Sequence, residues 1–135
     1  MLALMGAFVQ AQDTWLTVVG NPGDPESDIV DIQPQSLPSS PGVANYLVRV
    51  NRAKLRSSWD DIPYRSYTAS VVIDCSARKG RYVSIAFHMM PLWAGKPHKT
   101  QVFSAAEERP MLFLSIEPNP TDRIIRAACM RRAAN

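Results

Sequence analysis

The chain has 135 residues, a length that favours one domain with a substantial hydrophobic core. Its residues are 46% hydrophobic and 20% charged, which is ordinary for a globular protein and excludes a chain that is disordered throughout. The formal net charge of +3 is a mild basic excess, and no apolar run approaches the roughly 18 residues of a membrane-spanning helix.

The N-terminal segment is apolar over residues 1–9, and Val9 and Ala11 suit cleavage after residue 11. This pattern predicts a secretory signal peptide over residues 1–11 and a single domain over residues 12–135. No Lys or Arg precedes the apolar stretch, so the signal is partial or atypical. The alternatives are a loose hydrophobic tail or a first β-strand.

Short strands are predicted where β-branched, aromatic or alternating apolar residues gather. In chain order they span residues 14–19, 28–33, 43–51, 67–75, 81–89, 100–104 and 111–116. Turn residues fill 20–27, and Pro and Ser fill 33–42, while residues 52–64 are predicted to be a long polar connection. The strand at 111–116 is continuously apolar and is expected to be buried.

The clearest strand pair is residues 67–75 and 81–89, which the turn Ser76 to Gly80 joins into a hairpin. The side chains expected on its buried face are Tyr67, Ala69, Val71, Ile73, Cys75, Val83, Ile85, Phe87 and Met89. Asp74 falls on the other face, where it is expected to pair with Arg78 or Arg81.

Residues 122–132 have helical spacing, with Thr121 as the N-cap and Asp122 in the first turn. Arg131 and Arg132 fall in the last turn, where cations suit the helix dipole. The apolar stripe of this predicted helix consists of Ile124, Ile125, Ala128 and Cys129.

The two cysteines, Cys75 and Cys129, favour a disulfide in an exported chain and two buried thiols in a cytosolic one. Their wide separation excludes the usual redox and zinc motifs. If they pair, the helix must lie across the apolar face of the sheet. The predicted fold is therefore α+β: a mainly antiparallel β-sheet with a C-terminal α-helix packed on one face and held by a disulfide.

The segment Tyr67–Cys75, followed by Arg78 and Arg81, resembles the core pattern of the bacterial surface-adhesin protein E family. The resemblance extends over roughly residues 13–130. Its other landmarks are Trp15, Val30, Asp31, Ser36, Pro118, Thr121 and Cys129.

The resemblance implies an exported protein of Gram-negative bacteria with an antiparallel sheet and a disulfide-held C-terminal helix. Family members with known roles bind host matrix and serum proteins, so such partners are expected. The characterised adhesins are lipid-anchored, whereas no cysteine stands at the predicted cleavage point here; periplasm and cell surface therefore both stay open. Phe113 occupies the place where the family pattern leads us to expect Trp.

No residue pattern points to catalysis. His88 and His98 have no Cys, Asp or Glu at metal-ligand spacing and are expected at the surface, so a hydrolase would rest on these two histidines alone. The adjacent pair Asp60 and Asp61 is typical of a turn. The sequence thus predicts a non-enzymatic protein without metal or cofactor.

Basic residues cluster around Arg49 to Arg56, Arg78 to Arg81 and Arg126 to Arg132. The functional interpretation is a patch for acidic macromolecules, and the alternative is an ordinary solvated surface. The low net charge argues against nucleic acid. Trp59 and Trp93 are expected either to anchor a partner or to pack beneath their own loops. The candidate partner-binding residues are Arg52, Lys54, Arg56, Trp59, Trp93, Arg126, Arg131 and Arg132.

The sequence therefore predicts an exported binding domain for host or extracellular macromolecules. The alternative is a periplasmic structural or accessory domain with no adhesive activity. An exposed sheet edge would support a homodimer, and the sequence leaves the oligomeric state open.

Overall fold

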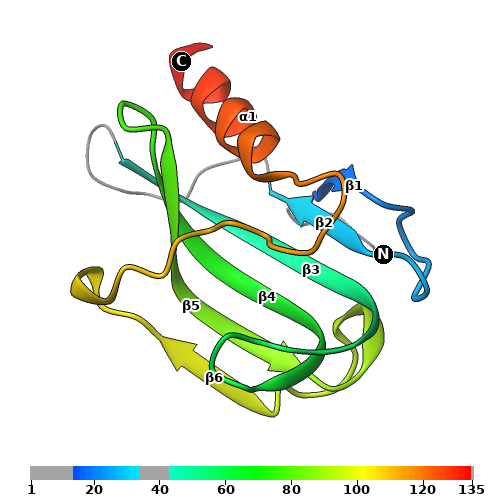
Figure 1. Ribbon diagram of the computed structural model, residues 1–135. Helices are drawn as coiled ribbons and strands as arrows, with labels where there is room; N and C mark the ends of the chain where they lie inside the picture. The colour runs from blue at the N-terminus through cyan, green and yellow to red at the C-terminus, as the bar shows by residue number, and fades with distance from the viewer. Residues whose placement is uncertain (1–13, 34–42, 135) are drawn as a thin grey trace, which may run out of the picture.

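A computed structural model describes residues 14–33 and 43–134, so the predicted signal peptide lies outside the described residues. Its sheet has six antiparallel strands, and each strand pairs with the next along the chain (Figure 1). The strands are β1 (Leu16–Val19), β2 (Ile29–Ile32), β3 (Val43–Ser57), β4 (Pro63–Asp74), β5 (Lys79–His88) and β6 (Lys99–Val102). The helices are the short η1 (Pro91–Trp93) and η2 (Ala105–Glu107) and the C-terminal α1 (Thr121–Ala134). The predicted α+β fold class is confirmed.

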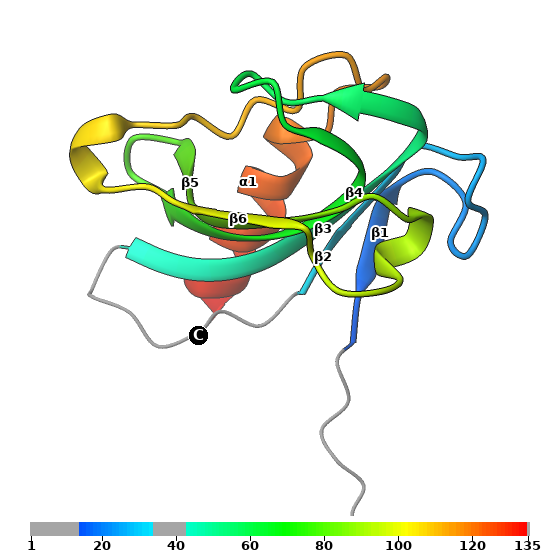
Figure 2. The same cartoon turned by 90° about the horizontal axis from the view of Figure 1, so that it is seen from below.

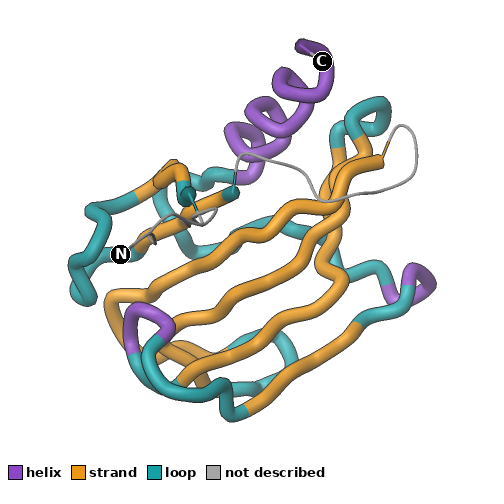
Figure 3. The backbone as a smooth tube through the Cα atoms, turned by 180° about the vertical axis from the view of Figure 1, so that it is seen from behind, coloured by secondary structure: helices purple, strands orange, loops and turns teal. Residues whose placement is uncertain are grey.

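The long strands β3, β4 and β5 form the middle of the sheet (Figure 3). Residues 52–57 continue β3 and residues 63–66 begin β4, so the predicted polar connection over residues 52–64 is wrong. A register shift between Asn51 and Arg56 lets the pairing resume at Arg56 and Tyr64. Polar side chains are compatible with strand here, because the end of this hairpin projects into solvent.

The sheet has one continuous apolar face, which forms the core. The predicted buried face of residues 67–75 is confirmed, with Ile73 and Val71 fully enclosed. In β5 the alternation changes at a register shift opposite Ser70 and Val71, so that Tyr82 joins the core and Val83 does not. The predicted core positions of Val83 and Met89 are therefore wrong, and Met89 is exposed.

Helix α1 lies on the concave side of the curved sheet, at the end where β4 finishes (Figure 2). Its predicted stripe is buried at Ile124, Ile125 and Ala128. The Tyr46 hydroxyl of β3 donates a hydrogen bond to the Ala128 carbonyl at 3.1 Å. Cys75 and Cys129 form the predicted disulfide, with Cα atoms 5.5 Å apart. Among the described residues no helix has the length and apolar character that a membrane span requires.

Residues 109–118, which we call the crossing segment, run over the same face of the sheet before α1 begins (Figure 1). The predicted strand at 111–116 is wrong, because Phe113 (φ 47°) and Ser115 (φ 63°) adopt left-handed backbone conformations that interrupt an extended chain. An apolar run shows that a segment is buried but does not fix its backbone. Leu112 and Leu114 of this run in fact face outward, at 46% and 73% exposure.

Candidate functional site

A pocket of about 550 Å³ opens between the crossing segment, the tip of the β3–β4 hairpin and β5. Its volume lies within the range of small-molecule and side-chain binding pockets. The strands supply Arg52, Arg56, Ser57, Tyr64, Tyr67, Tyr82, Ile85 and Phe87, and the hairpin turn supplies Ser58 and Trp59. The crossing segment supplies Arg109, Pro110, Leu112, Phe113, Leu114, Ser115 and Ile116.

Aromatic rings form the floor of this pocket. Tyr67 is at their centre, with ring centroids 5.5 Å from Tyr64, 5.8 Å from Phe87 and 6.1 Å from Tyr82. The Tyr82 ring continues the cluster toward Phe113 of the crossing segment, at 6.4 Å. Most of these pairs meet edge to face, the arrangement that aromatic quadrupoles favour. The floor is therefore a rigid apolar surface.

Two hydroxyl groups are enclosed in this floor. Tyr67 and Tyr82 share a hydrogen bond of 2.7 Å between their oxygens. Burial is the largest cause that raises the pKa of each phenol above its ordinary value of 10.0. Both groups are therefore neutral at physiological pH, and the floor carries no charge.

Arg52 anchors the crossing segment to the sheet. Its side chain is 3% exposed and donates from Nη2 to the Ser115 carbonyl at 2.9 Å. Its Nε is 3.2 Å from a carboxylate oxygen of Asp28, and its Nη1 is 3.4 Å from the Tyr64 hydroxyl. Arg52 thus holds the wall of the pocket, and because it is buried it does not belong to the surface available to a partner.

Arg109 lies at the rim, close to the tip of the β3–β4 hairpin. Its Nη2 is 3.2 Å from both carboxylate oxygens of Asp60, and its guanidinium is 5.5 Å from the centre of the Trp59 ring. Its Nε is enclosed and has no hydrogen-bond partner among the described residues. Asp60 therefore leaves part of the Arg109 donor set unused.

Arg56 is the exposed cation of the pocket lining. Among the described residues, no side chain or carbonyl forms a hydrogen bond or ion pair with its guanidinium. The lining contains three arginines, and none of the described lining residues is acidic. Two of these arginines are already paired, Arg52 with Asp28 and Arg109 with Asp60, so the charge of Arg56 is the one that favours a negatively charged group at the mouth.

Three large apolar side chains are exposed around the same mouth. Trp59 is 49% exposed, Leu112 46% and Leu114 73%. We call these three residues, together with Arg56 and Arg109, the rim. Exposed aromatic and aliphatic groups beside arginines are typical of surfaces that bind another molecule.

The opposite face of the sheet has a different organisation, because the loop around η1 covers it. Asn51 is fully buried there; its Nδ2 donates to the carbonyls of Pro25 and Ser27, and its Oδ1 accepts from the Leu92 amide. Ser66, also fully buried, donates to the Met90 carbonyl at 2.7 Å. These polar groups hold two loops on the sheet.

Trp93 belongs to this covered face and packs beneath its own loop. Its Nε1 donates to the carbonyls of Val50 and Tyr67, at 3.1 and 3.0 Å. The Arg49 guanidinium lies 4.0 Å from the Trp93 ring centre and 4.3 Å from that of Trp15. Trp93 therefore stabilises the fold, the second of the two roles expected from the sequence.

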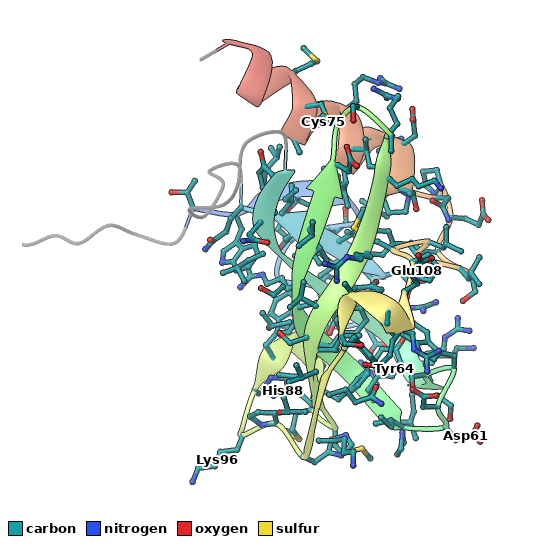
Figure 4. The ribbon with its side chains drawn as sticks, turned by 90° about the vertical axis from the view of Figure 1, so that its left-hand side faces the viewer. Asp61, Tyr64, Cys75, His88, Lys96 and Glu108 are labelled. Carbon is teal, nitrogen blue, oxygen red and sulfur yellow. A yellow bond between two sulfur atoms is a disulfide. The ribbon has the colours of Figure 1, made fainter. Side chains whose placement is uncertain are left out.

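The two histidines lie outside the pocket lining. His88 is only 7% exposed, so the expectation of a surface histidine is wrong for it. The η1 loop covers it, and its Nδ1 is 3.3 Å from the Ala94 carbonyl. Figure 4 places His88 and Lys96 on the side of the sheet opposite Tyr64 and Glu108. His98 is exposed, as expected, and its Nε2 is 2.8 Å from the Pro63 carbonyl. No cluster of potential metal ligands occurs within residues 14–33 and 43–134.

The remaining basic candidates are scattered. Lys54 is exposed near Arg56 but does not line the pocket. Arg126 pairs with Asp122 on α1 at 2.7 Å, and this pairing lowers the pKa of the Asp122 carboxyl. Arg131 and Arg132 belong to the last turns of α1, and their side chains lie outside the described part of the chain.

The expected pairing of Asp74 with Arg78 or Arg81 is wrong. Asp74 accepts hydrogen bonds from the Ser76 hydroxyl and from the amides of Ser76 and Ala77, and the Ser76 hydroxyl is the largest cause that lowers its pKa. Arg78 instead lies 3.5 Å from Asp122 of α1. The β4–β5 turn is therefore stabilised locally, and its arginine reaches the helix.

Sequence reasoning found two residues of the rim, Arg56 and Trp59, and missed Arg109, Leu112 and Leu114. The missed residues belong to the crossing segment, which was interpreted as a buried strand and the end of a loop. The left-handed residues that turn Leu112 and Leu114 outward leave no clear pattern in the sequence.

These features define a small disulfide-closed α+β domain with an open aromatic pocket on one face of its sheet. The chain belongs to the Surface-adhesin protein E family, whose model matches residues 15–130. This confirms the resemblance drawn from the residues. Family membership implies an exported or surface location and suggests binding to extracellular molecules. Comparisons with curated proteins and with solved structures gave no significant match.

Proposed function

We propose that the domain is a non-enzymatic binding module for extracellular macromolecules and that the rim of the aromatic pocket is its contact surface. One observation carries this proposal: Trp59, Leu112 and Leu114 expose large apolar side chains around one open pocket. Arginines stand among them, and Trp and Arg dominate the energetics of protein interfaces. Family membership supports the same class of function.

The partners that fit this proposal are matrix or serum proteins that present an acidic surface with protruding apolar side chains. The exposed Arg56 attracts the acidic group, and the pocket accepts the apolar one. Because long-range attraction between charges is screened by salt, the association rate falls as ionic strength rises.

Export is part of the proposal. Residues 1–11 act as the signal peptide in it, and the mature domain reaches either the periplasm or the surface of a Gram-negative cell. Protease treatment of intact cells separates the two locations: digestion of the domain supports surface display, and protection until the outer membrane is opened supports the periplasm.

The binding proposal is tested with immobilised matrix and serum proteins and the purified full chain. The variants are Leu114→Glu at the rim and Leu55→Glu, which changes a comparably exposed leucine of β3 outside the pocket. We expect at least one partner to bind, and we expect Leu114→Glu to weaken that binding by about tenfold or more. Leu55→Glu should leave it unchanged.

Two results contradict the proposal. If both variants weaken binding equally, the rim is not the contact surface. If the unaltered protein binds nothing even at low ionic strength, the accessory-domain alternative is favoured, in which the domain has no adhesive partner.

A further inference from the structure

We infer that the aromatic pocket accepts an apolar group that carries a carboxylate, with the apolar body on the tyrosine floor and the carboxylate at Arg56. This inference rests on the proposed function, because it names the chemistry of the group that the binding module receives. It adds a class of ligand to a site that the family alone does not define.

The floor and the volume of the pocket indicate that it accepts an apolar group. Tyr64, Tyr67 and Phe87 are buried and in mutual ring contact, and Tyr67 meets the other two edge to face, so their positions hold with or without a ligand. The Tyr67 and Tyr82 hydroxyls bond to each other, which leaves the floor without a strongly hydrated group. A cavity of about 550 Å³ above such a floor suits a body of one or two rings or an alkyl chain.

The anionic half follows from the arginines. Arg52 is engaged with Asp28 and the crossing segment, and Arg109 is engaged with Asp60. Arg56 has no such partner among the described residues, lines the pocket and is exposed to solvent. A guanidinium matches the geometry of a carboxylate with two parallel hydrogen bonds, so Arg56 is the group that a ligand acid would meet.

The cost of removing water from the ligand carboxylate decides where in the pocket that carboxylate lies. A carboxylate placed on the buried tyrosine floor would lose its hydration without a cation beside it. At the mouth it keeps contact with water and meets Arg56. The ligand is therefore oriented, with its apolar end inward and its acid outward.

The test uses two fluorescent probes that share an apolar body. Anilinonaphthalene sulfonate carries an anion that stands in for the carboxylate, and phenylnaphthylamine is neutral. We expect both to bind the oxidised full chain and to brighten. We expect Arg56→Gln to weaken binding of the sulfonate probe by about fivefold and to leave the affinity for the neutral probe unchanged.

Two further variants locate the effect. Lys96→Gln removes an exposed charge on the other side of the sheet and should leave the binding of both probes unchanged. Leu114→Glu places a negative charge at the mouth, so it should weaken binding of the sulfonate probe more than binding of the neutral probe. Circular dichroism and the melting temperature confirm that each variant is folded.

Displacement of the sulfonate probe identifies the source of the acid. Decanoate is compared with decanol, and a short peptide with a C-terminal Phe carboxylate is compared with its amide. If decanoate displaces the probe and the peptide acid does not, the natural ligand is a free apolar acid. If the peptide acid displaces the probe, the natural ligand is the C-terminus of a protein. Both results support the inference. Equal displacement by the neutral partners, or none by either acid, overturns it.

Failure of the inference is distinct from failure of the proposed function. If Arg56→Gln weakens the binding of both probes equally, or if neither probe binds, the inferred class of ligand is wrong. The binding module itself survives that result when an immobilised macromolecule still binds and Leu114→Glu still weakens it.

Discussion

The tyrosine hydroxyls beneath the pocket couple the fold to alkaline pH. The pKa values of Tyr67 and Tyr82 are raised in the folded protein, mainly by burial, whereas the unfolded chain ionises near the ordinary value of 10.0. Below that pH both states hold their protons, and the tyrosines add no pH dependence. Above it the unfolded state loses protons that the folded state keeps, so ionisation favours unfolding.

We therefore expect the free energy of unfolding to fall steeply as the pH rises above 10.0. Urea denaturation on either side of that pH measures the slope. The double variant Tyr67→Phe/Tyr82→Phe removes both phenols and should show a shallower fall. An identical slope in the variant would mean that other groups cause the alkaline loss.

Trp59 and Trp93 differ in burial and in hydrogen bonding, so we expect their replacement to affect stability differently. Trp93→Phe removes an indole N–H that satisfies two strand carbonyls and shrinks the ring beside Arg49, so the free energy of unfolding should fall by about 2 kcal/mol. Trp59→Phe changes a ring that is 49% exposed and should cost less than about 0.5 kcal/mol. Equal losses in urea denaturation would contradict the assignment of Trp93 to the fold and Trp59 to the surface.

At the scale of elements, the crossing segment is the part that forms the pocket. Its backbone bonds to β5 only at Arg109 and Met111, and beyond that point side-chain hydrogen bonds hold it. Arg52 bonds to the Ser115 carbonyl, while Asn119 and Thr121 donate to the Leu112 carbonyl at 2.8 and 2.9 Å. The pocket wall therefore depends on individual polar contacts.

Replacement of Arg52 tests this dependence. Arg52→Met removes the guanidinium and leaves Asp28 and the Ser115 carbonyl without it, so we expect a loss of about 3 kcal/mol in the free energy of unfolding. Lys54→Met, two residues along β3 at an exposed site, is the control and should change little. Similar stability of the two variants in urea would show that Arg52 does not anchor the segment.

The regular elements were the predictable part of this fold. The alternation in residues 67–75 and the stripe from Ile124 to Cys129 follow from periods that one buried face imposes. Predictions from local composition were wrong where the backbone departs from the regular alternation of a strand or from the expected end of one. These places are the shift in β5 that buries Tyr82, the extension of β3 past residue 51, and the turns at Phe113 and Ser115. The pocket lies where these departures meet, so most of its rim was not predicted.

At the scale of the whole molecule, the disulfide joins the end of the sheet to the helix. Cys75 follows β4 and Cys129 lies in α1, so the bond closes a loop that contains β5, β6 and the crossing segment. Cross-linking across 54 residues stabilises by about 4 kcal/mol in the chain-entropy model.

We expect the variant Cys75→Ala/Cys129→Ala to lose about 4 kcal/mol in the free energy of unfolding, because its unfolded chain is no longer restricted by the cross-link. A reducing agent should destabilise the unaltered protein and have no effect on this variant. Thiol titration of the unfolded protein should find two thiols only after reduction. Free thiols before reduction would remove the covalent basis of the architecture.

We propose that the face of the sheet with the aromatic pocket is the one that binds. Backbone chemical shifts of the isotope-labelled protein, recorded while anilinonaphthalene sulfonate is added, show which face a ligand contacts. We expect the largest shifts in residues 109–116 and 56–64, around the rim and the hairpin tip. Largest shifts in the η1 loop over residues 89–98, on the opposite face, would contradict it.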